Sequence, residues 1–337
     1  MAQQTTAPER KYIKDLLPNQ FIDTVLTMNN CQLGQTRGGK PFLKCLLSDK
    51  SGQTAGRMWN ATEELFEKLP TDGFVWVSGQ TQPYQGQMQI IIEDIRPTQP
   101  NPEELADLLP CTQFDIGEMF AALTQRLGAL DHPAIKALAQ AYLDDEALMH
   151  RFRQAPAAMV LHHAYIGGLL EHTLQLMRLA DVFCPLYPQL NRDLVVMGLF
   201  IHDLGKCVEL SWTTGFSYSE DGRLVGHIGR GAIMLEAKAR AVAEAGTSVA
   251  EPVLRVLHHI ILSHHGKPEF GALKVPATPE AVAVSHLDDM DAKLHMVIAA
   301  ADRERFAQRS ATESAFTDKI WALETQIYRP DPTTLGQ

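Results

Sequence analysis

Short β-prone runs alternate with turn-forming residues over the first hundred positions of the chain. The runs are rich in β-branched and aromatic residues, are separated by Gly, Asn and Asp, and cover residues 21–28, 41–49, 53–60, 74–81 and 87–95. A helix-like stretch at residues 61–69 lies between the third and fourth runs. This order is typical of a small five-stranded Greek-key barrel, the OB-fold. We therefore predict an OB-fold domain over residues 12–97.

A proline cluster then interrupts the chain, and the periodicity becomes helical. Pro97, Pro100 and Pro102 predict a linker at residues 98–110, because proline breaks both strands and helices. We predict an all-α domain over residues 111–328 and a flexible tail at 329–337. Its expected helices cover residues 103–109, 116–127, 133–143, 165–183, 192–204, 228–245, 250–265, 279–307 and 314–328. Residues 215–226 predict a hairpin that turns at Asp221 and Gly222.

The barrel carries side chains suited to single-stranded nucleic acid. Stacking faces are available from Phe42, Trp59 and Tyr84, and cations for phosphate contacts from Arg37, Lys40, Lys44 and Arg57. An equally weighted alternative is that Phe42 and Trp59 belong to the core and that the cations are solvated surface. The GQTRGGK segment, residues 34–40, has the spacing of a phosphate loop. However, Pro41 replaces the required Ser or Thr and a strand follows, so we predict a hairpin turn there.

Composition narrows the class of protein. The chain has 337 residues and a net charge of −10, and its longest apolar run, residues 194–201, is too short to cross a bilayer. We expect neither membrane insertion nor secretion. Five scattered Cys without a C-x-x-C pair argue against a disulfide framework and a thiolate zinc site, which favours a cytoplasmic location. Residues 1–100 carry 10 basic and 10 acidic residues, so all the excess acid is C-terminal.

All 13 histidines lie from His132 onward, and some form an ordered series with acidic residues. The series is His172, His202, Asp203, His227, His264, His265 and Asp288, and several members fall at predicted helix ends. Imidazole and carboxylate suit manganese, cobalt, iron or zinc. Seven candidates exceed the three or four that one hydrolytic cation needs, so we predict two divalent cations.

Asp203 is the natural bridge between the two predicted cations because its carboxylate has two oxygens. One cation would lie beside His172, His202 and Asp288, and the other beside His227, His264 and His265. A water between them would supply hydroxide for phosphoester hydrolysis. A lone histidine on an apolar helix face is more often a hydrogen-bonded core residue than a ligand, and adjacent histidines can be surface residues without a role. We interpret six histidines outside the series in that way: His132, His150, His258, His259, His286 and His295.

The motifs themselves resemble a known family. HDLGK at residues 202–206, with His172 upstream and Asp288 downstream, resembles the HD superfamily of metal-dependent phosphohydrolases. Four further stretches are similar to the YhaM-type 3′-5′ exoribonucleases: HHAYIGGLLEHT at 162–173, GHIGRG at 226–231, ILSHHGKPEFGA at 261–272 and HLDDMDAK at 286–293. The resemblance implies an N-terminal OB-fold, a C-terminal HD domain and a pair of divalent cations, typically manganese or cobalt.

Charge requirements suggest further residues around the predicted centre. Lys206 is a candidate to neutralise a phosphate oxygen or the leaving group, although a plain helix-end cation fits nearly as well. His163, Tyr165 and Arg230 are candidate donors to a phosphate. Asp291 shares a helix face with Asp288 and is a candidate partner for a ligand histidine. Glu171 points about 100° away from its neighbour His172, so we do not expect it to be a ligand.

The leading hypothesis is a metal-dependent 3′-5′ exonuclease. It would act on single-stranded RNA, with single-stranded DNA as a further candidate substrate, and release nucleoside 5′-monophosphates. The direction and the RNA preference are implied only by the resemblance. One alternative is a phosphohydrolase of small or cyclic nucleotides, and another is a nucleic-acid-binding module without activity. An acidic C-terminal half would bind long strands weakly unless a homo-oligomer concentrates basic surface.

Overall fold

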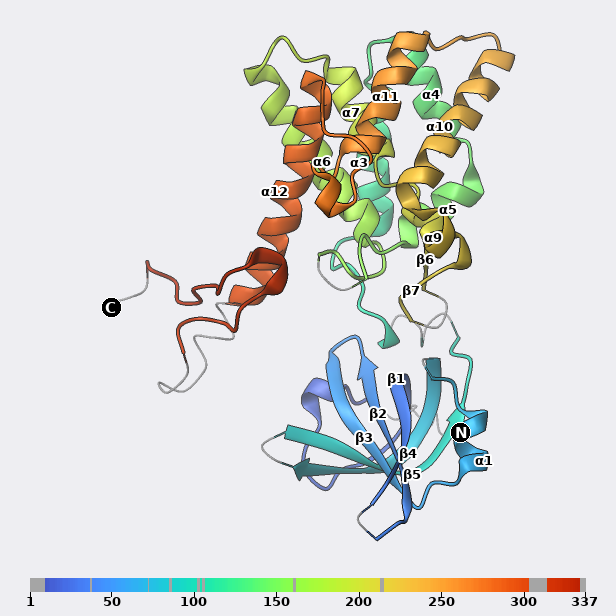
Figure 1. Ribbon diagram of the computed structural model, residues 1–337, viewed down its shortest axis with the longest axis vertical. Helices are drawn as coiled ribbons and strands as arrows, with labels where there is room; N and C mark the ends of the chain where they lie inside the picture. The colour runs from blue at the N-terminus through green and yellow to red at the C-terminus, as the bar shows by residue number, and fades with distance from the viewer. Residues whose placement is uncertain are drawn as a thin grey trace, which may run out of the picture. The chain divides into compact units, whose positions relative to one another are not determined.

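The chain folds into a β-barrel unit and a helical unit. The structure, a computed structural model, describes residues 10–333 apart from 37, 72, 85–86, 102–103, 105–106, 160–161, 213–214 and 303–313. One unit comprises Met1–Cys111 and Ser211–Ser217, and the other comprises Thr112–Leu210 and Tyr218–Gln337 (Figure 1). The predicted class, a small OB-fold barrel followed by an all-α domain, is confirmed by this architecture.

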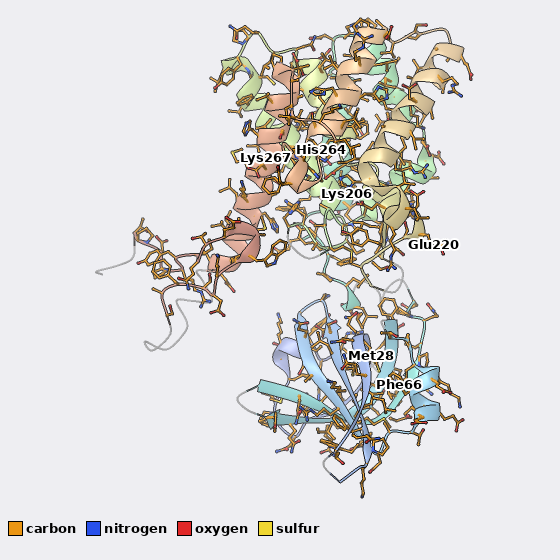
Figure 2. All side chains as sticks on the ribbon, in the orientation of Figure 1. Met28, Phe66, Lys206, Glu220, His264 and Lys267 are labelled. Atoms are coloured by element: carbon orange, nitrogen blue, oxygen red, sulfur yellow. The ribbon has the colours of Figure 1, made fainter. Side chains whose placement is uncertain are left out.

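Five strands close the barrel in the order β1-β2-β3-β5-β4. They are β1 (Phe21–Gln35), β2 (Pro41–Asp49), β3 (Gly52–Trp59), β4 (Gly73–Tyr84) and β5 (Gln87–Pro97), with α1 (Glu63–Lys68) between β3 and β4. The β3–β5 pair is parallel and the other pairs are antiparallel. The interior is filled by inward-facing side chains such as Leu26, Leu43 and Val77, and Figure 2 labels Met28 among them.

Local signals explain two features of the barrel. Thr62 caps α1 by accepting a hydrogen bond from the backbone N–H of Leu65, as the predicted helical stretch requires. The segment with the phosphate-loop spacing is the β1–β2 turn, closed by a hydrogen bond from the Thr36 N–H to the Lys40 carbonyl. A phosphate loop would lead into a helix, whereas this segment leads into β2.

Helices make up most of the second unit. They are α3 (Ile116–Gly128), α4 (Pro133–Leu143), α5 (Glu146–Gln154), α6 (Gly168–Phe183), α7 (Arg192–Ile201), α8 (Lys206–Glu209), α9 (Glu220–Leu224), α10 (Gly226–Glu244), α11 (Glu251–Ser263) and α12 (Pro279–Ala301). The almost wholly apolar α7 is central and packs against α6, α11 and α12. No helix in the described ranges is both long and apolar enough to span a membrane.

Two of the predicted elements are wrong, the 215–226 hairpin and the 314–328 helix. The paired strands are β6 (Leu210–Ser211) and β7 (Ser217–Tyr218), so the hairpin does not turn at Asp221 and Gly222. Those two residues belong to α9, because the Ser219 hydroxyl accepts a hydrogen bond from the Gly222 N–H and caps a helix there.

Residues 314–328 do not form the predicted helix. They contain one short 3-10 turn at Trp321–Leu323 and two isolated bridges, including Phe316 with Tyr328. The predicted helix 279–307 ends at Ala301, and residues 303–307 lie outside the described part of the chain. The predicted helix 103–109 also includes residues outside it.

Candidate metal centre

Five helical segments bring the predicted histidines and acids to one place. His172 lies in α6, and His202 and Asp203 directly follow α7. The others are His227 in the first turn of α10, His264 and His265 just after α11, and Asp288 in α12. Figure 2 labels His264 and Lys206 within this region of the helical unit. All seven predicted ligands therefore belong to one cluster.

The first half of the cluster gathers around Asp288 and Asp203. The Nε2 atom of His172 lies 3.2 Å from Asp288 Oδ1, and the Nε2 atom of His202 lies 3.9 Å from the same oxygen. His202 Nε2 is also 3.4 Å from Asp203 Oδ2. Ligand atoms of His172, His202 and Asp203 all lie within 4.8 Å of one another, a spacing that suits one cation.

The second half of the cluster faces the other oxygen of Asp203. Asp203 Oδ1 lies 3.6 Å from His227 Nε2 and 3.5 Å from His264 Nε2. His265 completes the group, since its ring centroid is 4.4 Å from that of His264 and 5.2 Å from that of His227. Asp203 thus directs one oxygen toward each half, which is the arrangement a bridging ligand needs.

Each histidine is oriented through its Nδ1 atom. In His202, His264 and His265 this atom donates to a backbone carbonyl, of Leu199, Ile261 and Phe270 respectively, at 2.8 to 2.9 Å. The Nδ1 of His172 donates to Asp291 over 2.8 Å, and that of His227 donates to Glu209 over 3.0 Å. A proton on Nδ1 leaves a lone pair on Nε2, so each ring presents a ligand atom to the centre.

The inward-facing atoms fit divalent cations. The Nε2 atoms of His172, His202, His227 and His264 and the Oδ1 atom of Asp203 are buried and have no hydrogen-bond partner among the described residues. Buried polar atoms without partners are rare because each costs about 1–3 kcal/mol. Five of them converging at one place are explained if a cation completes their bonding.

Neighbouring charges keep Asp203 in its metal-binding form, and burial does the same for His264 and His265. Burial opposes ionisation, but Lys206 and His202 hold the pKa of Asp203 well below its usual value. Burial also opposes the charge on Lys206, whose Nζ lies 2.6 Å from Asp203 Oδ2, yet Asp203 raises its pKa. Burial lowers the pKa of His264, and burial with the charge of His264 lowers the pKa of His265 to about 4. These two imidazoles are therefore neutral at pH 7.

His163 and Tyr165 are already engaged in a hydrogen-bonded chain behind His172. The Tyr165 hydroxyl donates to Glu171 over 2.9 Å and lies 2.8 Å from His163 Nδ1. His163 Nε2 lies 3.1 Å from Asp291 Oδ2, the oxygen that also accepts from His172. Both residues lie near the centre, as predicted, but their polar atoms contact protein groups. A phosphate contact from either residue stays a prediction.

Arg230 and Lys206 differ in what they contact. Arg230 forms a two-point ion pair with Asp221 of α9, so its guanidinium ties α9 to α10. Lys206 contacts the proposed bridging ligand Asp203 directly. Glu171, which we did not expect to be a ligand, bonds to Tyr165 and to the hydroxyl of Thr112 instead.

Sequence reasoning missed Glu209. One of its carboxylate oxygens accepts from both the backbone N–H and the ring Nδ1–H of His227. Burial raises the pKa of this carboxyl group, but the hydrogen bond and charge of His227 lower it overall. Glu209 ends a four-residue helix without clear periodicity, so the sequence offers no signal for this pairing. His162 was also left unassigned, and its ring centroid lies 5.8 Å from that of His172.

The barrel presents the predicted stacking residues on its outer surface. Phe42 and Trp59 are paired across β2 and β3 with ring centroids 5.5 Å apart, and Trp59 is 45% exposed. Trp59 is therefore not part of the core. Gly34 lies beneath the Phe42 ring, where an added Cβ atom would come within 3.0 Å of it. A side chain at this position would displace the ring from the barrel surface.

Two cations extend this surface along the same strands. Lys44 and Arg57 are directly paired across β2 and β3, and the Arg57 guanidinium lies 5.3 Å from the centroid of the Tyr84 ring. Asn30 and Gln32 line a small depression beside them. Lys40 is exposed, and Arg37 lies outside the described residues. Aromatic and cationic side chains thus lie side by side on the β2–β3 surface, as binding of single strands requires.

Comparison with known families agrees with the division of the chain into a barrel unit and a helical unit. Residues 24–98 match an OB-fold nucleic acid binding domain, and residues 169–293 match the HD domain. The HD match covers all seven clustered ligands and the residues that orient their rings, and it implies binding of divalent metal. The fold and the site therefore define a hydrolase of the HD class with an attached OB-fold.

Relatives over nearly the whole chain define the family. The 3′-5′ exoribonuclease YhaM of Geobacillus sp. (strain WCH70) is 34% identical over 92% of this chain and 92% of its own length. The protein of the same name from Bacillus licheniformis is 33% identical over 92% of this chain and 95% of its own. The chain belongs to the YhaM family of 3′-5′ exoribonucleases and is a hydrolytic nuclease.

The similarity to one of the solved structures covers only part of the chain. A chain of a replication protein A heterotrimer bound to single-stranded DNA matches at 18% identity, covering 31% of this chain and 76% of that chain. The TM-score is 0.21.

Proposed function

We propose that this enzyme removes nucleoside 5′-monophosphates one at a time from the 3′ end of single-stranded RNA, with two divalent cations at the centre. Family membership supports the activity. The observation that carries the two-cation centre is the set of five buried, unpartnered atoms of His172, His202, Asp203, His227 and His264. We propose single-stranded DNA as a second substrate, because it shares the scissile phosphodiester.

The ligands divide as the distances suggest. One cation would be held by His172, His202 and Asp288. The other would be held by His227, His264 and His265. Asp203 would bind both cations. When bound, the pair would acidify a water molecule and offset the negative charge that grows on the phosphate. We propose manganese as the cation. Mixed imidazole and carboxylate ligands suit manganese, and they also suit cobalt, iron and zinc, which are the alternatives.

The surrounding residues keep these ligands in place. Lys206 holds Asp203 Oδ2, which leaves Asp203 Oδ1 directed toward His227 and His264. Its side chain is still 12% exposed, and its charge remains close enough to the centre to attract the substrate phosphate. Asp291 and Glu209 fix the rings of His172 and His227.

The β2–β3 surface of the barrel is the proposed site for the strand. Bases would stack on Trp59, Phe42 and Tyr84, and phosphates would contact Lys44 and Arg57. The barrel sequence is neutral overall, so stacking contributes more than charge to binding there. We also propose a cytoplasmic enzyme, since all five cysteines are free thiols, and a homo-oligomer that gathers basic surface.

End-labelled RNA tests the activity directly. With a 5′-labelled single-stranded oligoribonucleotide and manganese, we expect a ladder that shortens by single nucleotides from the 3′ end. Asp203→Asn should reduce the rate at least about 1,000-fold, because a shared ligand of both cations is lost. The control Asp289→Asn, an exposed residue beside the centre, should be fully active.

Two other outcomes would contradict the proposal. Internal cleavage products would exclude an exonuclease. Hydrolysis of cyclic dinucleotides without any ladder would favour a phosphohydrolase of small nucleotides.

A further inference from the structure

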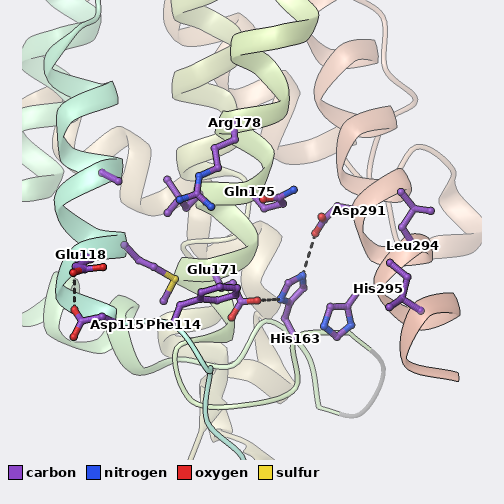
Figure 3. A pocket seen from close by; sticks show the side chains of 14 residues that line it. Phe114, Asp115, Glu118, His163, Glu171, Gln175, Arg178, Asp291, Leu294 and His295 are labelled. Carbon is purple, nitrogen blue, oxygen red and sulfur yellow. Dashed lines mark hydrogen bonds and ion pairs between the residues drawn. The ribbon is translucent and has the colours of Figure 1, made fainter. Parts of the chain in front are cut away.

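A groove of about 640 Å³ lies beside the centre, between the loop before α3, α3 itself, α6 and α12 (Figure 3). Its wall includes Asp291 and His163, which bond to each other. The same oxygen of Asp291 accepts from His172, so the groove is separated from the proposed cation site by little more than one imidazole ring. Its volume is sufficient for a nucleotide.

The apolar parts of the groove can hold a flat ring. Leu294 and Ile298 lie one turn apart on α12, face it from one side and are 52% and 70% exposed. Phe114 lines its other side and is 62% exposed. The rings of His163 and His295 lie with centroids 4.1 Å apart and planes inclined by 33°. Aromatic and aliphatic surfaces of this kind accept a nucleobase by stacking.

Several polar groups in the groove are available to a ligand. Arg178 and Gln175 are exposed, lie nearly one turn apart on α6, and form no ion pair or side-chain hydrogen bond with any described residue. The Nδ1 atom of His295 is buried and likewise has no partner among the described residues. A buried ring nitrogen without a partner is costly, and a ligand donor or acceptor would satisfy it.

Four carboxylates also line the groove, and they restrict the ligand. Glu171 and Asp291 already accept hydrogen bonds, and Asp115 caps α3. The carboxylate of Glu118, which also lines the groove, has no hydrogen-bond or ion-pair partner among the described residues. Arg178 is the one Arg or Lys among the residues that line the groove. The four carboxylates would therefore repel a ligand that carries several phosphates. A neutral base that carries hydrogen-bond donors, with at most one phosphate directed to Arg178, fits this balance.

We propose that this groove is a nucleoside-binding site, with the base on the aliphatic and histidine surfaces and a single phosphate near Arg178. The inference rests on the proposed function for the class of ligand. Two sources share this chemistry. The ligand is either a nucleotide of the strand close to the scissile phosphate, or a free nucleoside 5′-monophosphate, the expected product.

Direct binding of adenosine 5′-monophosphate tests the site. The full chain, treated with a chelator to remove binding through cations, is titrated by isothermal calorimetry with this nucleotide, with adenosine and with inorganic phosphate. We expect saturable binding of the nucleotide and of adenosine, and none of phosphate alone. Arg178→Ala should weaken binding of the nucleotide but not of adenosine.

A matched pair of variants locates the binding. Ala122 lines the groove from α3, whereas its neighbour Ala121 is exposed and does not line it. Ala122→Trp fills the groove and should weaken nucleotide binding at least about tenfold, which is 1.4 kcal/mol. Ala121→Trp should have no effect. Absence of saturable binding by the wild-type chain, or an equal effect of both variants, would overturn the proposal.

Kinetics distinguish the two sources of the ligand. If the groove holds part of the strand, Ala122→Trp raises KM for an oligoribonucleotide, and added adenosine 5′-monophosphate competes with it. If it holds a free nucleotide, the added nucleotide changes kcat in the wild type and not in Ala122→Trp. Both results support the site. Nucleotide binding by a chain that does not degrade RNA would refute the proposed function but still support the proposal that the groove binds a nucleoside.

Discussion

At the scale of single residues, the ionisation of His172 links metal binding to folding. Burial opposes its charge, but the adjacent carboxylates of Asp288 and Asp291 raise the pKa of His172 to about 9. In the metal-free protein His172 is therefore protonated at pH 7, and a cation has to displace this proton. Its folded-state pKa lies above the unfolded value of about 6.5, so the stabilisation is complete below pH 6.5 and is lost as pH rises through 9.

The first prediction at this scale concerns pH. Between pH 6.5 and 9, the metal-free protein should lose on the order of 2 kcal/mol of its free energy of unfolding. The manganese-loaded protein should lose little over this range, because a bound cation replaces the proton on His172. Urea unfolding at a series of pH values, with chelator or with manganese, measures both curves. Parallel curves would show that His172 does not bind the cation.

A second prediction concerns Asp291, which orients His172 without belonging to either proposed ligand set. Asp291→Asn should weaken manganese binding about 10- to 100-fold, since an amide is a poorer acceptor for the His172 Nδ1–H. The KM for RNA should stay constant while kcat falls. Calorimetric titration with manganese measures the affinity, and Asp289→Asn is the matched control two residues away. Equal affinities in the two variants would mean that His172 keeps its orientation without Asp291.

At the scale of elements, close backbone contacts position the segments that carry the ligands. A Cβ atom added to Gly205 would lie 2.0 Å from the backbone oxygen of His227, and one added to Gly168 would lie 2.0 Å from that of His163. Neither glycine has a positive φ, so close approach is what excludes a side chain. These contacts join the start of α8 to the start of α10, and the start of α6 to the His163 segment.

Gly205→Ala tests this arrangement. The methyl group would push α10 and His227 away from Asp203, so we expect a loss of at least about 2 kcal/mol of unfolding free energy and weaker manganese binding. Gly128→Ala is the control, because no atom lies within 4 Å of a Cβ added near the end of α3. That variant should be neutral or slightly more stable. Thermal unfolding of both variants measures the difference. Equal melting temperatures for the two variants would contradict the prediction that the Gly205–His227 contact excludes a side chain.

Elements with strong local signals were predictable from the sequence. The helix 133–143 was predicted with the observed bounds of α4, because Pro133 at its first position and the His132 cap mark its start. By contrast, α5 was missed, since it buries only Leu148, Met149 and Phe152 among charged residues. The ligand series was also predictable, because its histidines and acids stand in an ordered set of motifs. The partners of the ligand rings were less predictable, because Glu209 meets His227 only through tertiary packing.

At the scale of the whole molecule, separate units carry the stacking surface and the hydrolytic centre. Loss of stacking should therefore change substrate binding without changing the chemistry. Trp59→Ala should raise KM for a 20-nucleotide RNA about tenfold, as expected for the loss of one stacked base, and leave kcat unchanged. Turnover of a dinucleotide should stay at the wild-type level, since the centre alone holds so short a substrate.

Phe21→Ala is the matched control for this last prediction. Phe21 is also an exposed aromatic residue of the barrel, but it pairs with Gln80 of β4 and lies away from the β2–β3 surface. The variant should keep the wild-type KM on long RNA. Steady-state kinetics on both substrate lengths measure the difference. A fall in kcat on the dinucleotide in Trp59→Ala would mean that the barrel surface takes part in the hydrolytic step. That result would contradict the assignment of strand binding and hydrolysis to separate units.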